Sequence, residues 1–455
     1  MPALSHGLSR FRGEAKPPGP SPRRSRESMA MDSKASMFTH GARPARIALF
    51  SGNYNYTLDG ANKSLNRLVD HVQRTTGAQV RIYSPTSPTP AFAPVGELVS
   101  VPSVTIPFRR DYRLALGLPA AVRRDVEAFA PDLIHLSAPD LLGAAALKLG
   151  RRLKTPVVAS LHTLFDSYLD YYGLGGLRAL ARRRLWQFYG ACDFVMTPTP
   201  AIGEELRAQN LGVQVRTWAR GVDADLFNPA RRSAAWRAAQ GFDPDRPVIV
   251  FLGRLVMEKG LAAFADTIDR LAASGPSPQV LIIGDGPARA WFQERLPMAT
   301  FAGFLTGEAL ATALASADIF LNPSTTETFG NVNLEAMASG LAIVCADAPN
   351  TRALLRDGRD AILCAPSDPA SYAQALLSLC QDQNRLRRMG AKALDRSAAY
   401  RWTEILDEVV DIYAEALDAR ALAPSRAEVS PHELRARTGR RASLIDAQAA
   451  ALSTP

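Results

Sequence analysis

The chain has 455 residues, 47% apolar and 21% charged, so it can build real hydrophobic cores and is not wholly disordered. It contains no run of about 18 apolar residues, so no membrane-spanning helix is predicted. The net charge of +9 is concentrated at the ends, with +5 in residues 1–44 and +3 in residues 420–455. The nearly neutral body between them argues against nucleic-acid binding by the folded part.

Residues 1–44 combine turn-forming and charged residues without a periodic apolar face, which predicts a disordered basic tail. They lack the apolar segment of a secretory signal. The four cysteines form no CxxC pair, which argues against a zinc site and favours buried thiols in a reducing compartment: Cys192, Cys345, Cys364 and Cys380. We therefore expect a cytoplasmic protein.

Short apolar runs alternate with helical patterns through the rest of the chain. The first series of predicted strands covers 47–50, 80–83, 133–136, 157–161 and 194–196, and the second covers 248–252, 280–283, 319–321, 342–345 and 362–364. Unbroken apolar runs are typical of strands that are buried on both faces of a parallel sheet. Repeated strand–helix units of this kind predict an α/β fold with doubly wound sheets.

A turn-rich segment between Gly221 and Phe242 separates the two series. It predicts two Rossmann-like domains, 45–225 and 226–401, that face each other across a cleft. Helix 402–419 is expected to cross back to the first domain, and 420–455 is expected to be a second disordered tail. Ligands of open α/β sheets bind beyond the carboxyl ends of the strands, so the cleft is the expected site.

Two groups of polar residues follow predicted strands of the second domain. Arg254 and Lys259 come after strand 248–252, and two cations beside a glycine suit a diphosphate, although a solvated loop is an equal alternative. A polar loop after strand 319–321 leads into a helix from about Gly330, whose first amides can hold an anion. Glu335 in this mostly apolar helix is predicted to be a buried acceptor for ribose hydroxyls.

Together these residues resemble glycosyltransferase family 4, whose members are retaining enzymes with the two-domain GT-B fold. The resemblance rests on Glu327 and Glu335, which have seven residues between them, with the two upstream cations, and it spans roughly 46–418. It implies that Arg254 and Lys259 bind the donor diphosphate. It also implies that Glu327 contacts the transferred sugar and Glu335 the ribose. Backbone groups expected to hold phosphate or sugar belong to Phe329, Gly330 and Asn331.

The same resemblance assigns roles in the first domain and to the nucleotide base. His162 and Asp166 follow strand 157–161 and are expected to orient sugar hydroxyls during catalysis. Gly60 lies in a loop expected to approach the donor phosphate. The backbone at Gly303 and Phe304 matches the segment that holds the base, which leaves guanine and uracil both open. No metal ion and no cofactor are expected.

The pattern around His162 resembles mannosyltransferases that build glycolipids and phosphoinositol mannosides. The favoured function is therefore transfer of a hexosyl group, mannosyl first, from a nucleotide sugar such as GDP-mannose or a UDP-sugar to a lipid or lipid-linked glycan. A UDP-sugar-dependent transferase with a soluble or polysaccharide acceptor, a GT-B-like epimerase or phosphorylase and a catalytically silent binding protein stay open. At 347–351 the chain departs from the family's usual Gly-Gly turn, so the donor sugar is not fixed.

An acid-free stretch between Tyr171 and Cys192 predicts a basic amphipathic helix that contains Arg178, Arg182, Arg183 and Arg184. Such a helix can lie in the interface of an anionic bilayer. It can equally be a packed helix with a solvated basic face. In the first case the protein would sit peripherally on the inner face of the plasma membrane.

Overall fold

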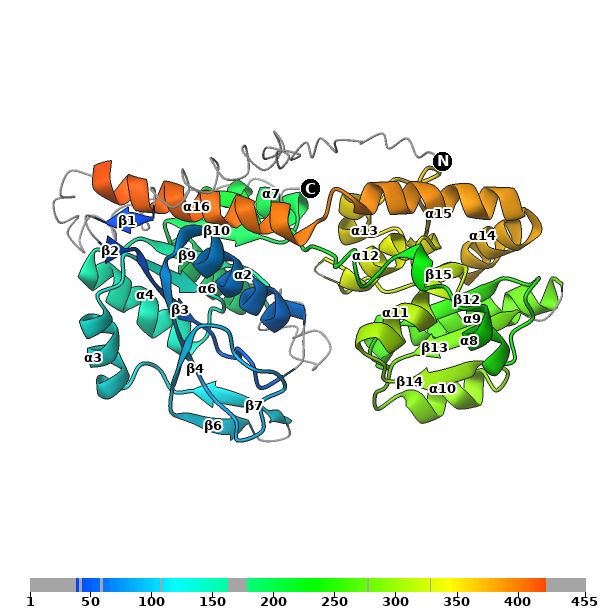
Figure 1. The fold of residues 1–455 in the computed structure, drawn as a ribbon, viewed down its shortest axis with the longest axis horizontal. Coiled ribbons are helices and arrows are strands. Elements are labelled where there is room, and N and C mark those ends of the chain that lie inside the picture. Colours follow the sequence, from blue (N-terminus) through cyan, green and yellow to red (C-terminus); the bar gives the residue numbers. More distant parts are fainter. Residues whose placement is uncertain are drawn as a thin grey trace, which may run out of the picture.

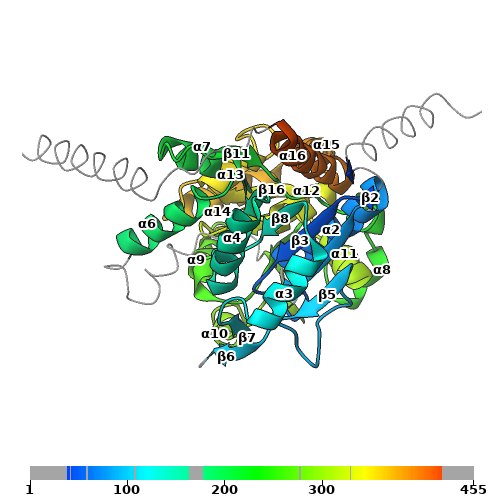
Figure 2. The ribbon, with the colours of Figure 1, turned by 90° about the vertical axis from the view of Figure 1, so that its left-hand side faces the viewer.

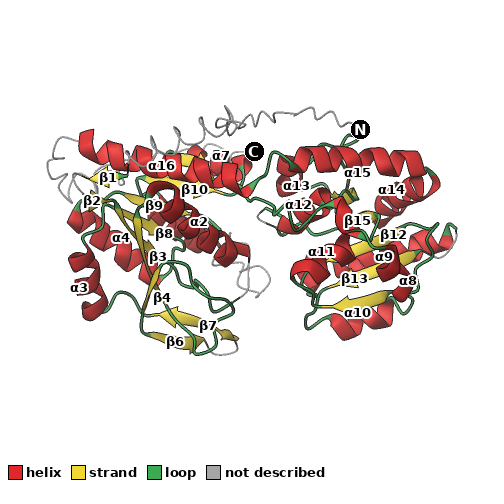
Figure 3. Cartoon of the chain, in the orientation of Figure 1, coloured by secondary structure: helices red, strands yellow, loops and turns green. Residues whose placement is uncertain are grey.

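The computed structural model describes residues 38–40, 43–57, 60–106, 109–162, 178–275, 278–327 and 329–422. Within them the chain forms two α/β domains that lie next to each other (Figure 1). Each domain is a parallel sheet with helices on both faces (Figure 3). The predicted fold class, two doubly wound Rossmann-like domains, is confirmed.

The described part of the first domain contains a seven-stranded parallel sheet in the order β11-β10-β9-β8-β3-β4-β5. The strands are β3 (Arg46–Phe50), β4 (Gln79–Ser84), β5 (Glu97–Ser100), β8 (Leu133–Leu136), β9 (Val157–Ser160), β10 (Phe194–Thr197) and β11 (Gln214–Thr217). Helix α2 (Gly60–Thr76) packs on one face. The other face is covered by α3 (Ala120–Phe129), α4 (Leu141–Leu153), α6 (Arg178–Tyr189) and α7 (Pro200–Ala208). Figure 2 looks onto this domain with α3 and α4 in front.

The second domain contains a six-stranded parallel sheet in the order β14-β13-β12-β15-β16-β17. Its strands are β12 (Val248–Leu252), β13 (Gln279–Ile283), β14 (Thr300–Gly303), β15 (Ile319–Asn322), β16 (Ala342–Ala346) and β17 (Ile362–Cys364). Side chains along each strand point alternately to the two faces of the sheet, and each face has its own buried core. The helices are α8 (Ala234–Ala239), α9 (Leu261–Ala273), α10 (Arg289–Arg295), α11 (Gly307–Ala315), α12 (Asn331–Ala338), α13 (Pro349–Leu354), α14 (Pro369–Gln381) and α15 (Gln383–Ser397).

The last helix, α16 (Trp402–Leu422), returns to the first domain. The residue before it pairs with Val222 of the interdomain segment in an isolated bridge. Its buried face, which includes Leu406 and Val409, joins the core formed by α2 and the first sheet. The His71 ring on α2 bonds the Asp407 carboxylate at 3.0 Å. The helix therefore ties the far end of the sequence to the first domain, as its place above that domain in Figure 1 shows.

The structure differs from the sequence predictions mainly at the edges of the sheets. Strands β5 and β14 are only partly buried, so they carry no continuous apolar run and were not predicted. The hairpin of β6 (Ser103–Ile106) and β7 (Arg109–Ala115) was also missed. The short strands β1 (Thr39–His40) and β2 (Arg43–Pro44) pair with each other, and Phe38 is buried. The folded part therefore begins before the predicted boundary at residue 45.

The four cysteines are free thiols, and all but the half-buried Cys380 are buried. The predicted buried thiols are thus confirmed for Cys192, Cys345 and Cys364. None of the described helices is long and apolar enough to cross a lipid bilayer.

The packing of α16 predicts that a substitution near residue 406 weakens the first domain. Leu406→Ala deletes a buried side chain and should cost about 2–4 kcal/mol. Hydrogen–deuterium exchange should rise in α2, β8 and β9, the elements that α16 contacts. The matched variant Leu386→Ala on α15 should instead raise exchange in the second domain. Faster exchange of the second domain in Leu406→Ala would contradict this assignment of α16.

Candidate active site

The loops that follow β12 and β15 are tied together at the carboxyl edge of the second sheet. Gly260 adopts φ +78°, and a Cβ on it would lie 3.0 Å from the backbone of Pro323, so only glycine fits there without strain. The Thr326 hydroxyl donates to the carbonyl of Glu258 at 3.1 Å. The Lys259 ammonium donates to the Glu327 carboxylate at 2.5 Å. Two of the predicted site residues are thus in direct contact.

Arg254 lies on the same loop and is exposed. Among the described residues its guanidinium has no hydrogen-bond or ion-pair partner. An unpaired arginine beside a lysine that is only half-buried is available to bind an anionic ligand.

The start of α12 is the second element of the site. Gly330 begins the helix with φ +89°, and no side chain caps it. Two buried donors close to this point, Asn333 Nδ2 and Asn350 Nδ2, have no partner among the described residues, and neither does the buried Ser324 Oγ on the preceding loop. Free helix amides surrounded by unpaired buried donors form a site for an anion or a polar ligand.

Glu335 lies one turn further along α12 and is half-buried. Desolvation raises the pKa of its carboxyl to about 7, and the charge of Lys63 on α2 opposes that rise. The carboxyl makes no hydrogen bond within the described part of the chain. It therefore has room for a donor from a ligand, such as a ribose hydroxyl.

The first domain meets this site at the start of α2. Gly60 lies against Asn331, so closely that a Cβ on Gly60 would be 2.6 Å from Asn331 Nδ2. Helix α7 also contacts α13 of the second domain. The carboxyl edges of both sheets therefore border one cleft. The structure brings Gly60, Lys259, Glu327, Gly330 and Asn331 to it, with Glu335 and Arg254 beside them.

His162 follows β9 at the carboxyl edge of the first sheet. Its Nδ1 accepts a hydrogen bond from Arg220 at 2.7 Å, and its Nε2 lies 2.8 Å from Ser160 Oγ. Burial, with smaller effects of Arg220 and His135, holds the pKa of His162 well below its usual range. Both ring nitrogens already have partners. A sugar hydroxyl could contact one of them only by exchange with a protein partner.

The remaining predicted residues have different outcomes. Asp166 lies outside the described residues, so its expected role stays a prediction. Gly303 adopts φ +73° at the end of β14, and Phe304 after it is 67% exposed. Phe329 is buried in the core of the second domain, which leaves its backbone as the part available to a ligand. No group of three His, Cys, Asp or Glu side chains in the described residues lies close enough together to hold a metal ion.

Sequence reasoning missed several polar residues at the cleft. Asn333, Asn350 and Ser324 give no signal in the sequence beyond their position in or near a polar loop. Lys63 and Arg220 are remote in sequence from the motifs that they approach. For Arg220, the available signal was a charged residue between Trp218 and Gly221.

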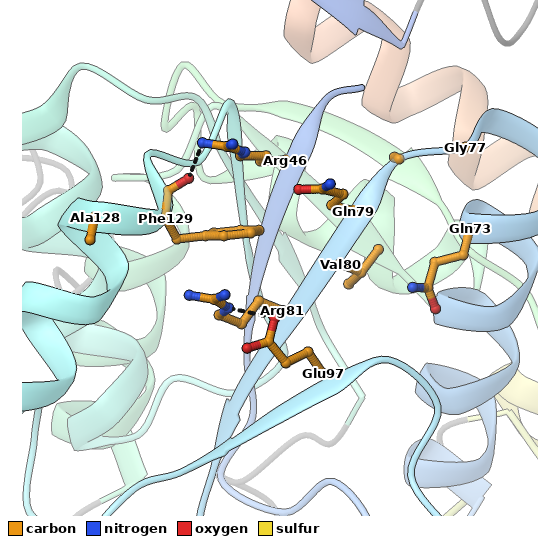
Figure 4. Close-up of a pocket in the computed structure, with 10 residues that line it drawn as sticks. Arg46, Gln73, Gly77, Gln79, Val80, Arg81, Glu97, Ala128 and Phe129 are labelled. Atoms are coloured by element: carbon orange, nitrogen blue, oxygen red, sulfur yellow. Dashed lines mark hydrogen bonds and ion pairs between the residues drawn. The ribbon is translucent and has the colours of Figure 1, made fainter. Parts of the chain in front are cut away.

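A hollow also opens at the opposite edge of the first sheet, where β3, β4 and β5 begin (Figure 4). Its charged side chains are satisfied within the protein. Arg81 donates to Glu97 at 2.9 Å, and Arg46 donates to the carbonyl of Phe129 at 3.1 Å. The hollow lies away from the cleft, and the arginines named above already have partners in the protein.

Two family models match the chain. The model described as Glycosyltransferase Family 4 matches residues 58–226, and the model described as Glycosyl transferases group 1 matches residues 246–382. Each match falls within one of the two domains, and together they span both sides of the cleft.

Relatives of known activity match over most of their length. The chain is 32% identical over 393 residues to a GDP-mannose-dependent alpha-mannosyltransferase of Mycolicibacterium smegmatis, which covers 83% of this chain and 99% of that protein. It is 27% identical to a phosphatidyl-myo-inositol mannosyltransferase of Mycobacterium tuberculosis, over 79% of this chain and 94% of that one.

Solved structures show the same fold. A sucrose-phosphate synthase from Thermosynechococcus elongatus superposes with a TM-score of 0.65 at 21% identity, over 82% of this chain and all of that one. WaaG, a glycosyltransferase involved in lipopolysaccharide biosynthesis, superposes with a TM-score of 0.58 at 16% identity, over 80% and 99% of the two chains.

The raised pKa of Glu335 predicts a pH-dependent gain in stability on its replacement. Between its ordinary pKa of 4.5 and the folded value of about 7, the folded protein holds a proton here that the unfolded chain releases. The free energy of unfolding therefore falls as the pH rises through this range. Glu335→Gln should raise the Tm at pH 8 by about 2–4 °C and leave it unchanged near pH 4. Exposed Glu294→Gln is the control, and an equal gain at both pH values would contradict the prediction.

Proposed function

This chain is a glycosyltransferase of family 4, and from that premise we propose that it transfers a mannosyl group from GDP-mannose to a lipid or lipid-linked glycan. The family makes it a hexosyltransferase. The observation that carries the proposal is the uncapped start of α12, with the exposed Arg254 on the neighbouring loop after β12 and the uncommitted Glu335 carboxyl one turn along the helix. These groups offer separate partners for a diphosphate and a ribose. The mannosyltransferase relatives favour GDP-mannose as the nucleotide sugar.

The diphosphate would bind where positive charge is available. Arg254 can bind two phosphate oxygens at once, and the first amides of α12 add fixed dipoles. As the bond from the sugar to the phosphate breaks, negative charge grows on the leaving phosphate. Preorganised cations and amides stabilise this charge without reorganisation during the reaction.

Lys259 and Glu327 would exchange partners when the donor binds. In the ligand-free protein they neutralise each other at 2.5 Å. A diphosphate competes for the ammonium of Lys259, which releases the carboxylate of Glu327 to accept hydrogen bonds from sugar hydroxyls. We propose that the acceptor then attacks from the face that the phosphate leaves, so that the anomeric configuration is retained. His162 and Asp166 would border the sugar, and the backbone at Gly303 and Phe304 would hold the guanine.

The alternative functions use the same cleft. A UDP-sugar would occupy the same diphosphate and ribose positions, and it would differ from GDP-mannose in the base and in the sugar. An epimerase or phosphorylase would turn over the nucleotide sugar or a sugar phosphate without an added acceptor. The mannosyltransferase relatives favour neither.

The lipid acceptor requires access to a membrane surface, and α6 is the candidate contact. Its Leu185, Trp186 and Phe188 pack against the core of the first domain, so its apolar side does not enter a bilayer. Leu180 is 56% exposed, and Arg183 and Arg184 are exposed beside it. We propose a peripheral, mainly electrostatic contact of this basic edge with anionic lipid on the cytoplasmic face.

The donor assignment predicts the effect of removing Arg254. In a transfer assay with GDP-mannose and a bacterial lipid extract, the wild type should release GDP and form a mannosylated lipid. Arg254→Ala loses charge-assisted bonds to phosphate and should lower kcat/KM by about ten- to a hundredfold. The matched control Arg270→Ala, an exposed arginine of α9, should stay within twofold. Turnover of UDP-sugars alone, or full activity of Arg254→Ala, would contradict the proposal.

The membrane contact predicts a loss of lipid binding on charge reversal. Each basic residue near an anionic surface contributes about 1 kcal/mol. The double variant Arg183→Glu/Arg184→Glu should therefore bind vesicles that contain anionic lipid at least about tenfold more weakly in a sedimentation assay. Arg387→Glu/Arg388→Glu on α15 is the matched control. Equal binding of both variants, or equal binding of the wild type to neutral vesicles, would argue against a contact through α6.

A further inference from the structure

A chain of hydrogen bonds leads from His162 into the interior of the first domain. His162 Nε2 lies 2.8 Å from Ser160 Oγ, and Ser160 Oγ lies 2.9 Å from Nε2 of His135. The other ring nitrogen of His135 lies 2.6 Å from the hydroxyl of Tyr413 on α16. At the cleft end, Arg220 contacts His162 Nδ1 at 2.7 Å. The chain thus joins the interdomain segment, two strands and the last helix.

The direction of the donors follows from the arginine. A guanidinium can only donate, so His162 Nδ1 is the acceptor and its proton is on Nε2. Nε2 then donates to Ser160, whose own hydrogen finds an acceptor among the described residues only in Nε2 of His135. His135 in turn carries its proton on Nδ1 and donates to Tyr413. In this arrangement every ring nitrogen is satisfied, and the hydrogen of the Ser160 hydroxyl also has an acceptor.

The surroundings favour neutral rings. His135, Ser160 and Tyr413 are at most 1% exposed, and Arg220 is 5% exposed. Burial lowers the pKa of His135 to about 3. Arg220 has no carboxylate partner in the described residues, and desolvation lowers its pKa to about 10. Its guanidinium instead donates to the carbonyls of Trp218 and Ala219. Trp218 packs edge-on against both histidine rings.

We propose that Arg220, Ser160, His135 and Tyr413 are positioning residues that hold His162 as a neutral imidazole with its proton on Nε2. This inference rests on the proposed function only in that His162 borders the sugar site. His162 keeps some exposure, whereas the rest of the chain is buried, so the ring is fixed from behind. A neutral ring in one tautomer cannot serve as a general acid. The His162 ring instead provides a polar surface of fixed orientation at the carboxyl end of β9.

The proposal gives α16 a role beyond packing. Tyr413 lies 278 positions from His135 in the sequence and reaches it only because α16 crosses back to the first domain. Loss of the Tyr413 hydroxyl removes the acceptor for the Nδ1 proton of His135. That proton can then move to Nε2, which would stop His135 from accepting a bond from Ser160. Ser160 would then lose the acceptor for its own hydrogen, which weakens the support behind His162, while Arg220 still keeps the His162 proton on Nε2.

Nitrogen-15 NMR of histidine-labelled full-length protein at pH 7 tests the tautomer directly. His162→Gln and His135→Gln assign the two signals among the six histidines. The wild type should show a neutral His162 protonated on Nε2 and a neutral His135 protonated on Nδ1, and Tyr413→Phe should show a mixture of tautomers at His135. Tyr83→Phe is the matched control, because it removes an equally buried hydroxyl that bonds Asp125 at 2.8 Å. A charged or Nδ1-protonated His162 in the wild type, or an unchanged His135 signal in Tyr413→Phe, overturns the proposal.

Kinetics provide the second readout. Tyr413→Phe should lower kcat for GDP-mannose by about two- to tenfold, the value of one hydrogen bond, while KM for the donor stays within twofold. Tyr83→Phe should change neither constant. An unchanged kcat, or a change carried by KM alone, contradicts a positioning role. If GDP fails to bind the wild type, the proposed function fails, and the NMR result still decides on the hydrogen-bond chain.

Discussion

The start of α2 lies against the start of α12, and the chemistry of the cleft depends on this contact between the two domains. Residue 60 is a glycine, and a side chain there would have to displace the side-chain amide of Asn331. The contact places Lys63 of one domain within electrostatic range of Glu335 of the other. A ligand bound at α12 is therefore bordered by both domains. Neither domain alone provides all the groups that a nucleotide sugar and its acceptor require.

The cleft keeps polar groups in states that are unfavourable without a ligand. Glu335 is desolvated, Arg254 has no partner in the described part of the chain, and buried amides near Gly330 lack acceptors. Such groups reduce stability, and the two sheets with their separate buried cores compensate for them. Lys259 and Glu327 avoid this cost, because each neutralises the charge of the other. These features are typical of a site whose partners arrive with the substrate.

The sequence predicted the centre of the fold better than its edges. Strands such as Val248–Leu252 are buried on both faces, and an unbroken apolar run identifies them. Edge strands such as β5 are half-exposed and lack this signal. The site residues on local motifs, such as Lys259 and Glu327, were identified through the family resemblance, and the structure places them in contact. The hydrogen-bond chain behind His162 was not predictable, because Tyr413 and His135 share no local pattern and meet only through the course of α16.

Calorimetric titration of the full-length wild type with GDP and with UDP tests the central claim most directly, because the two nucleotides share the diphosphate and the ribose and differ in the base. The account predicts that GDP binds and that UDP binds about tenfold or more weakly, a difference of about 1.4 kcal/mol. Tighter binding of UDP would contradict the mannosyl donor, and binding of neither nucleotide would contradict the assignment of the cleft.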